Sequence, residues 1–109
     1  MTLITYDEFE KVEIRVGKII KVEDFPKARN PAYKLWIDFG YAVKKSSAQI
    51  TKYTQEDLLG RQILVVTNFP PRQIADFMSE VLVLGVVLEH EEVVLIKPEQ
   101  DVPLGKRIL

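Results

Sequence analysis

Residues 12–22 read Val-Glu-Ile-Arg-Val-Gly-Lys-Ile-Ile-Lys-Val, and the class of fold can be predicted from their pattern. Its apolar side chains at positions 12, 14, 16, 20 and 22 share even numbers, which is the period of a strand with one face toward a core. Gly17 and the out-of-phase Ile19 indicate a bulge or bend in that strand. A long, bent first strand is what a small closed barrel needs, because such a strand takes part in both of its sheets.

The segments that flank this strand predict one helical turn and two further strands. Thr5 to Glu8 fit a capping box, and a short helical turn through Glu10 follows. Residues 25–31 hold two prolines and therefore form a loop. Apolar and polar side chains alternate along residues 33–39, which predicts a half-buried second strand. We expect residues 43–50 to form a third strand, although the residues in the middle of this segment are polar.

The second half of the chain predicts a short helix and three more strands. Residues 54–60 begin with an N-cap candidate and end with a glycine, so we expect a short helix that plugs one end of the barrel. Residues 63–67 and 81–88 are apolar runs typical of buried strands, and residues 93–96 add a short strand. The segment 68–80 is too long for a hairpin and has helical spacing after its prolines.

The order of these elements predicts an all-β protein. A five-stranded barrel with a helix between its third and fourth strands is the OB arrangement, and the chain has no long crossover helix for a parallel sheet. At 109 residues the chain is long enough to bury one hydrophobic core. We therefore expect a single OB-fold domain over residues 1–109, with short helices and with extensions at both ends.

Composition excludes several classes of function. The absence of cysteine rules out disulfides, thiolate metal sites and cysteine nucleophiles. The only histidine, His90, lies in an acidic stretch typical of a hairpin tip, and the sequence has no glycine-rich phosphate loop, paired-histidine motif or nucleophile elbow. We therefore expect no enzymatic activity, no metal and no cofactor. The N-terminus lacks a signal-peptide pattern and no apolar run approaches the roughly 20 residues of a membrane span, so we expect a cytoplasmic protein without membrane insertion.

The charges are divided unevenly along the chain, although the formal net charge is only −1. Residues 11–72 hold 12 Lys or Arg against 6 Asp or Glu, whereas residues 73–109 hold 3 against 7. Such segregation favours a basic face on the molecule. The alternative is that the folded barrel mixes these segments on its surface.

The third strand carries the strongest signal for binding. Lys44 to Gln49 place two cations before short polar groups, where strands usually carry apolar or β-branched residues. Lysine and arginine suit phosphate contacts, while Ser, Gln and Asn bond sugars, bases or peptide amides. The alternative is a solvent-facing edge strand on which the lysines block unwanted pairing.

Several aromatic and apolar side chains fit a contact surface. Trp36 has the opposite parity to the apolar residues of its strand, so it points outward. It is either a stacking residue or is covered by the long loop or a second subunit. We expect two of four apolar residues in segment 68–80 to close the barrel and the others to form a patch for a partner. These four are Phe69, Ile74, Phe77 and Met78.

Four phrases of the sequence resemble the tRNA-binding domain family, which includes the C-terminal domains of some methionyl-tRNA synthetases. They are Phe9 to Ile19, Leu35 to Gly40, Asn68 to Arg72 and Pro103 to Lys106. Within that family, a group of export-related chaperones is similar to residues 45–52, 68–74 and 77–85. The resemblance implies an OB barrel, a homodimer built through both terminal segments, and binding of unfolded or export-destined polypeptides. It also implies assistance to export through the motor SecA.

The sequence departs from the wider tRNA-binding pattern at two places. Where the tRNA binders have a Ser-Gly-Ile phrase, it reads Ser46-Ser47-Ala48-Gln49-Ile50. Their Ser-Gln-Gly-Met phrase is replaced by Ser79-Glu80-Val81-Leu82. The carboxylate of Glu80 repels phosphate, which weighs against tRNA as a ligand.

The terminal segments 1–11 and 98–109 carry apolar side chains, but they have too little regular structure to form a layer that would bury them. Residues 98–109 form an extended tail with a turn at Leu104-Gly105. Packing these side chains against a symmetry mate would bury them in one self-complementary patch, so we expect both segments to form a dimer interface. The candidate interface residues are Tyr6, Phe9, Val102, Leu104, Ile108 and Leu109.

Three hypotheses for function remain open. The first is an ATP-independent chaperone whose groove holds an extended peptide, with polar groups for its main chain and apolar pockets for its side chains. The second is a tRNA-binding module in which cations contact phosphate and an aromatic ring stacks on a base. The third is a dimer that scaffolds another protein.

The candidate binding residues come mostly from the third strand and from segment 68–80. The polar residues for a peptide groove are Ser46, Ser47, Gln49 and Asn68. The candidate phosphate contacts are Arg15, Lys18, Lys34, Lys44, Lys45 and Arg72, with Trp36 or Phe69 for stacking. The complete set for peptide or RNA binding is Arg15, Lys34, Trp36, Lys44, Lys45, Ser46, Ser47, Gln49, Asn68, Phe69, Arg72, Phe77, Met78, Ser79 and Glu80.

Overall fold

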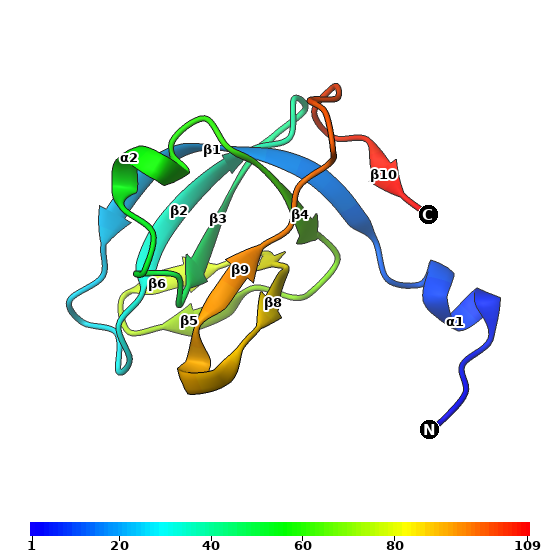
Figure 1. The fold of residues 1–109 in the computed structure, drawn as a ribbon, viewed down its shortest axis with the longest axis horizontal. Coiled ribbons are helices and arrows are strands. Elements are labelled where there is room, and N and C mark those ends of the chain that lie inside the picture. The colour runs from blue at the N-terminus through cyan, green and yellow to red at the C-terminus, as the bar shows by residue number, and fades with distance from the viewer.

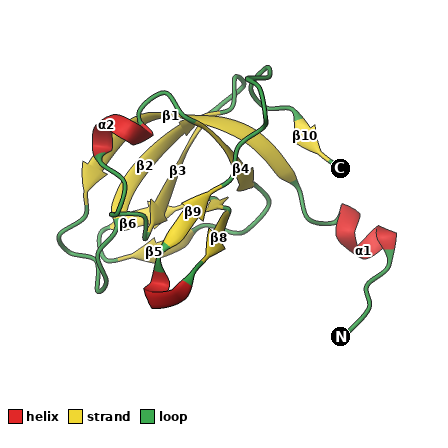
Figure 2. Ribbon diagram, in the orientation of Figure 1, coloured by secondary structure: helices red, strands yellow, loops and turns green.

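The computed structural model describes residues 1–109, and most of its regular elements are strands (Figure 1). The elements are α1 (Tyr6–Glu10), β1 (Ile14–Asp24), β2 (Tyr33–Asp38), β3 (Val43–Ala48), α2 (Gln55–Leu58), β4 (Gln62–Val66), β5 (Arg72–Ile74), β6 (Phe77–Ser79), β7 (Leu82–Val83), β8 (Gly85–Val87), η1 (Glu89–Glu91), β9 (Val93–Leu95) and β10 (Arg107–Ile108). Strands β3, β2, β1, β4 and β7 are neighbours in that order, β10 lies beside β1, and β5–β6 and β8–β9 form two separate hairpins. This nearly closed barrel with few short helices confirms the predicted all-β OB fold (Figure 2). None of its helices has the length and apolar character needed to cross a bilayer.

A bulge in β1 sets which of its side chains enter the core. The register with β2 shifts just after Ile19, so the alternation of side chains changes phase there. Ile19 is fully buried and Ile20 is 45% exposed, which is the reverse of the expectation from the even-numbered pattern. Gly17 packs against β2 so closely that a Cβ would collide with the side chains of Ile37 and Phe39.

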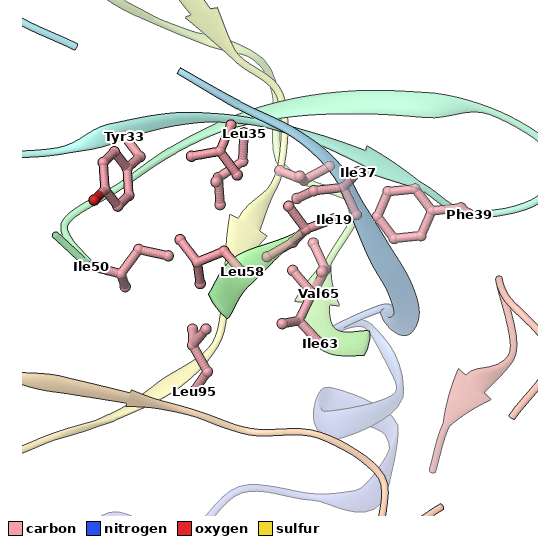
Figure 3. Packing of buried hydrophobic residues seen from close by; sticks show 12 residues of the cluster. Ile19, Tyr33, Leu35, Ile37, Phe39, Ile50, Leu58, Ile63, Val65 and Leu95 are labelled. Carbon is pink, nitrogen blue, oxygen red and sulfur yellow. The ribbon is translucent and has the colours of Figure 1, made fainter. Parts of the chain in front are cut away.

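The main core lies inside the barrel, between its strands and α2 (Figure 3). α2 contributes the fully buried Leu58, so this short helix covers one end of the barrel as expected. The Tyr33 hydroxyl donates to the carbonyl of Tyr53, and the Leu95 amide donates to the Tyr53 hydroxyl, which ties β2 to β9. The core residues are Ile19, Val22, Tyr33, Leu35, Ile37, Phe39, Ile50, Leu58, Ile63, Val65, Val81 and Leu95.

The sequence-based prediction for segment 68–80 is wrong, because the segment contains the β5–β6 hairpin. Ala75 has a φ of 52° and turns the chain, so Ile74 pairs with Phe77 across a tight turn. The prolines lie before β5 and not within it, which leaves the backbone donors of the hairpin available. Phe77 is 5% exposed and packs on Phe25 and Trp36, outside the main core.

The prediction of one buried strand over residues 81–88 is also wrong. The segment divides at Leu84 into β7, which pairs with β4, and β8, which pairs with β9. Gly85 lets β8 approach β9, because a Cβ at this position would collide with Val93. Several apolar side chains of the segment are therefore exposed, namely Leu82, Val86, Val87 and Leu88.

Both chain ends lie on the same side of the barrel (Figure 1). The capping box of α1 is confirmed, since the Glu8 amide donates to the Thr5 hydroxyl and the Thr5 amide donates to the Glu8 carboxylate, each over 3.1 Å. No residue of α1 is fully buried. At the other end, Gly105 has a φ of 83° in the expected turn, and β10 pairs with β1 through Ile14 and Ile108.

Candidate functional site

A groove runs between β3, the β5–β6 hairpin and β7. Its first part has a volume of about 480 Å³ and is lined by Ser47, Phe69, Pro70, Pro71, Arg72, Ile74, Ser79, Glu80, Val81 and Leu82. A second hollow of about 290 Å³ shares Ser47, Arg72, Ile74 and Leu82 with the first, and it continues past Gln49 to Val93 and Leu95. Because the two hollows share these walls, they lie next to each other, and together they are called the groove, which extends from Phe69 to β9.

Ser79 and Glu80, at the end of β6, form hydrogen bonds with the backbone along the edge of β3 that borders this groove. The Lys45 amide donates to the Glu80 carboxylate over 2.9 Å, and the Glu80 amide donates to the Lys45 carbonyl over 2.8 Å. The Ser47 amide donates to the Ser79 hydroxyl over 3.0 Å. Ser79 and Glu80 therefore take the place of a neighbouring strand on β3, and they hold the hairpin against the barrel.

The walls of the groove are mainly apolar, and one cation among them is free. Phe69 and Leu82 are 53% and 48% exposed, so both offer apolar surface to a ligand. Arg72 lines both parts of the groove and forms no ion pair with any residue of the chain. The groove can thus accept apolar side chains and offers one positive charge to an anionic group.

A second surface, the basic-aromatic face, lies on the outer side of β1, β2 and β3 and comprises Lys21, Lys34, Trp36, Lys45 and Phe77. Trp36 is the cross-strand partner of both Lys21 and Lys45. The Lys21 ammonium lies 4.5 Å from the centre of the Trp36 ring, and those of Lys34 and Lys45 lie 5.4 Å and 5.2 Å from the centre of the Phe77 ring. Trp36 and Phe77 pack edge to face with ring centroids 5.8 Å apart. The indole is therefore half-buried under the hairpin, which is the covered arrangement that the sequence left open.

The structure brings part of the candidate set together and disperses the rest. Ser47, Gln49, Phe69, Arg72, Ser79 and Glu80 line the groove, and Lys34, Trp36, Lys45 and Phe77 belong to the basic-aromatic face. Ser46 is 1% exposed, so its side chain faces the interior. Lys44 projects from the face of β3 opposite to Lys45, and Met78 is 39% exposed on the face of the hairpin opposite to Phe77. Lys18 is exposed on β1.

Arg15 and Asn68 hold the terminal segments to the barrel. Arg15 donates to the Glu13 carboxylate over 2.6 Å and to the Gly105 carbonyl over 2.7 Å. The Asn68 side chain accepts from the Glu13 amide over 2.9 Å and donates to the Lys11 carbonyl over 2.6 Å. The polar groups of both side chains are engaged within the chain, and neither residue lines the groove.

Two ion pairs outside the groove shift the pKa values of their members. The hydrogen bond from Arg15 lowers the pKa of Glu13 and raises that of Arg15, and a hydrogen bond from Thr67 also lowers the pKa of Glu13. The hydrogen bond from Lys27, at 3.0 Å, lowers the pKa of Asp76. This second pair ties the loop before β2 to the turn of the β5–β6 hairpin.

The candidate dimer residues differ in exposure. Tyr6 and Leu109 are 64% and 73% exposed, and Phe9 lies beside Tyr6 with ring centroids 6.4 Å apart. Val102, Leu104 and Ile108 are half-buried. The exposed part of this set therefore lies at the two ends of the chain.

The sequence-based set lacks Lys21 of the basic-aromatic face. It also lacks several groove residues, and the exposed Leu82 and the partly exposed Val93 are among them. Lys21 reaches Trp36 because the bulge in β1 changes the phase of the strand. Leu82 and Val93 reach the groove because residues 81–88 divide into two strands. Gly85 inside an apolar run is the one sequence signal that points to this division.

Comparisons with known proteins agree with this architecture. Residues 14–107 match the family model described as "Putative tRNA binding domain". The chain is similar to the crystal structure of the CsaA chaperone protein from Picrophilus torridus, with 50% identity and a TM-score of 0.92 over 98% of this chain and 100% of that chain. It is also similar to the chaperone CsaA from Bacillus anthracis str. Ames, with 47% identity and a TM-score of 0.94 over 99% of this chain and 100% of that chain. A curated relative, the methionine–tRNA ligase of Thermococcus kodakarensis, is 36% identical over 109 residues, which are 99% of this chain but only 14% of that ligase.

Proposed function

Since this chain belongs to the tRNA-binding domain family and is a CsaA-like member of it, we propose that it is a non-enzymatic chaperone that binds unfolded or export-destined polypeptides. The chaperone names of the similar structures support this role. The absence of cysteine fits action in the reducing cytoplasm. We further propose that the protein delivers such clients to the export motor SecA.

The apolar groove is the observation that carries this proposal. An unfolded chain exposes apolar side chains, and full burial of one of them gains about 1.5–3 kcal/mol. Phe69, Leu82 and the two prolines between β4 and β5 offer surface for such burial. The exposed side-chain amide of Gln49 can bond the main chain of a bound peptide. A groove with these features accepts many sequences, as a chaperone requires.

The proposed working form is a homodimer held by residues 1–11 and 98–109. Tyr6 and Leu109 expose apolar surface near the two chain ends, and β10 pairs with β1 alone. A symmetric partner would bury these groups against their own counterparts. Two grooves on one rigid body would then gain avidity for a long extended client.

Binding of tRNA is a second candidate function, which the basic-aromatic face favours. Lys21, Lys34 and Lys45 lie on the outer side of neighbouring strands, and OB domains bind oligonucleotides on such a face. Two observations weigh against it. Trp36 is half-buried under Phe77, which leaves less of its ring for stacking, and the Glu80 carboxylate adds a negative charge beside Lys45.

A titration separates the two functions. The purified protein is titrated with a fluorescent unfolded polypeptide and with bulk tRNA, each at low and at physiological salt. Binding that neutralises several phosphates weakens steeply with salt, whereas apolar peptide binding does not. We expect polypeptide binding to persist at physiological salt and tRNA binding to weaken roughly ten-fold or more. Binding of tRNA alone at physiological salt would contradict the chaperone proposal and support the second candidate.

A further inference from the structure

The apolar lining of the groove continues beyond Val93 onto the β8–β9 hairpin. Val93 lines the groove and is the cross-strand partner of Val87. Cross-strand partners point to the same face of a sheet, so Val87 extends the lining by one more side chain. Since Val87 is 74% exposed, the end of the groove presents an uncovered apolar side chain to solvent.

Three carboxylates stand at that same end. η1 forms the tip of the hairpin, where Glu89, Glu91 and Glu92 are all exposed. None of these carboxylates forms an ion pair within the chain. Arg72, the free cation of the groove, lines both of its parts and is absent from the hairpin tip. Along the groove, the unpaired cation of Arg72 and the unpaired carboxylates of the hairpin tip therefore lie at different places.

These charges argue against two occupants of the hairpin end. A second copy of the chain with its own tip at this place would bring three more glutamates, and like charges repel. An anionic membrane surface repels the tip for the same reason. A cationic polypeptide can make favourable contacts both with the apolar side chain of Val87 and with the carboxylates beside it.

We propose that the groove prefers extended segments in which a cluster of Lys or Arg borders an apolar run, with the cationic end at the β8–β9 tip. The apolar run lies over Val93 and Val87, and the cations face Glu89, Glu91 and Glu92. Targeting segments at the N-termini of exported chains have this composition. The inference rests on the proposed chaperone function and names the class of client that the groove selects.

Three peptides with the same apolar run test this inference, one ending in three lysines, one in three glutamines and one in three glutamates. Fluorescence anisotropy measures their affinity for the whole protein and for the variant E89Q/E91Q/E92Q, which keeps the size of each exposed side chain. We expect the wild type to bind the lysine peptide roughly ten-fold more tightly than the glutamine peptide at low salt, and the glutamate peptide most weakly. The triple variant should lose this preference and keep its affinity for the glutamine peptide.

A matched pair of valine variants locates the apolar part of the segment. Val87→Thr should weaken binding of the lysine and glutamine peptides about three-fold. Val94→Thr is the control, because Val94 is 41% exposed on the other face of the same hairpin. A lysine preference that persists in the triple variant, or equal effects of the two threonine variants, would overturn the inference. Failure of the wild type to bind even the glutamine peptide would overturn the chaperone function itself.

Discussion

The backbone amide of Lys45 donates a hydrogen bond to the Glu80 carboxylate over 2.9 Å, and the Glu80 amide donates one to the Lys45 carbonyl over 2.8 Å. Glu80 thus supplies, from its side chain and its main chain, both bonds that a neighbouring strand would give to β3 at this point. The carboxylate at position 80, which departs from the wider tRNA-binding pattern, has a structural role beside its electrostatic one.

Replacing Glu80 tests this structural role. Glu80→Ala leaves the half-buried Lys45 amide without its acceptor, so we expect the free energy of unfolding to fall by about 1–3 kcal/mol. Glu80→Gln keeps an acceptor oxygen and should recover most of that loss. Urea denaturation monitored by circular dichroism measures both variants, and equal destabilisation by Ala and Gln would show that the hydrogen bond does not matter.

Lysines of the basic-aromatic face should govern any binding of tRNA. In K21A/K45A we expect weaker tRNA binding and a salt dependence whose logarithmic slope is shallower by about 2, since each phosphate contact contributes about 0.9. Lys97→Ala is the control, because Lys97 is exposed and lies outside this face. Titrations at several salt concentrations give the slope, and an unchanged slope in the double variant would exclude this face as the tRNA site.

The Glu13–Arg15 pair should make stability depend on pH at the acidic end. The hydrogen bond from Arg15 lowers the pKa of Glu13 in the folded state, so Glu13 contributes stability above its unfolded pKa and loses it as the pH falls through the lowered value. Thermal unfolding of wild type and Glu13→Gln should therefore differ most near neutral pH, and the difference should shrink in acid. A difference that stays constant down to strongly acidic pH would contradict the assignment.

Charged residues at the chain ends should break the proposed homodimer. Y6D/L109D places carboxylates in the apolar surface near both termini, where a symmetric partner would bury them unpaired. We expect sedimentation velocity to show a dimer for the wild type and a monomer for this variant. Val86→Asp, at an exposed apolar site on the β8–β9 hairpin, should remain dimeric. A monomeric wild type at the same concentration would refute the dimer.

Local patterns predicted the parts of the fold that rest on local contacts. The alternation along residues 33–39 correctly gave the core residues of β2, because a one-sided strand needs only its own period. The capping box at Thr5 was equally predictable, since its partners are three residues apart. The hairpin at 72–79 was not, because its stability depends on Phe77 meeting Trp36 and Phe25 from distant strands.

The candidate site shows the same difference between what local patterns predict and what depends on tertiary contacts. Ser47, Arg72 and Ser79 were identified from residue type and motif, and all three line the groove. Arg15 and Asn68 have equally suitable side chains for binding, but tertiary contacts use their polar groups to hold the terminal segments. Residue type alone cannot distinguish a free polar group from one that the fold has already engaged.

The proposed function requires that unfolded polypeptide occupies the groove between β3, the β5–β6 hairpin and β7. The most direct test compares F69S/L82S, which removes two exposed apolar walls of the groove, with Met78→Ser, which alters an exposed side chain on the other face of the hairpin. The measurement is the affinity of each folded protein for a fluorescent unfolded polypeptide at physiological salt. We predict a loss of roughly ten-fold or more for F69S/L82S and no change for Met78→Ser. Wild-type affinity in F69S/L82S would contradict the claim and place the polypeptide elsewhere on the molecule.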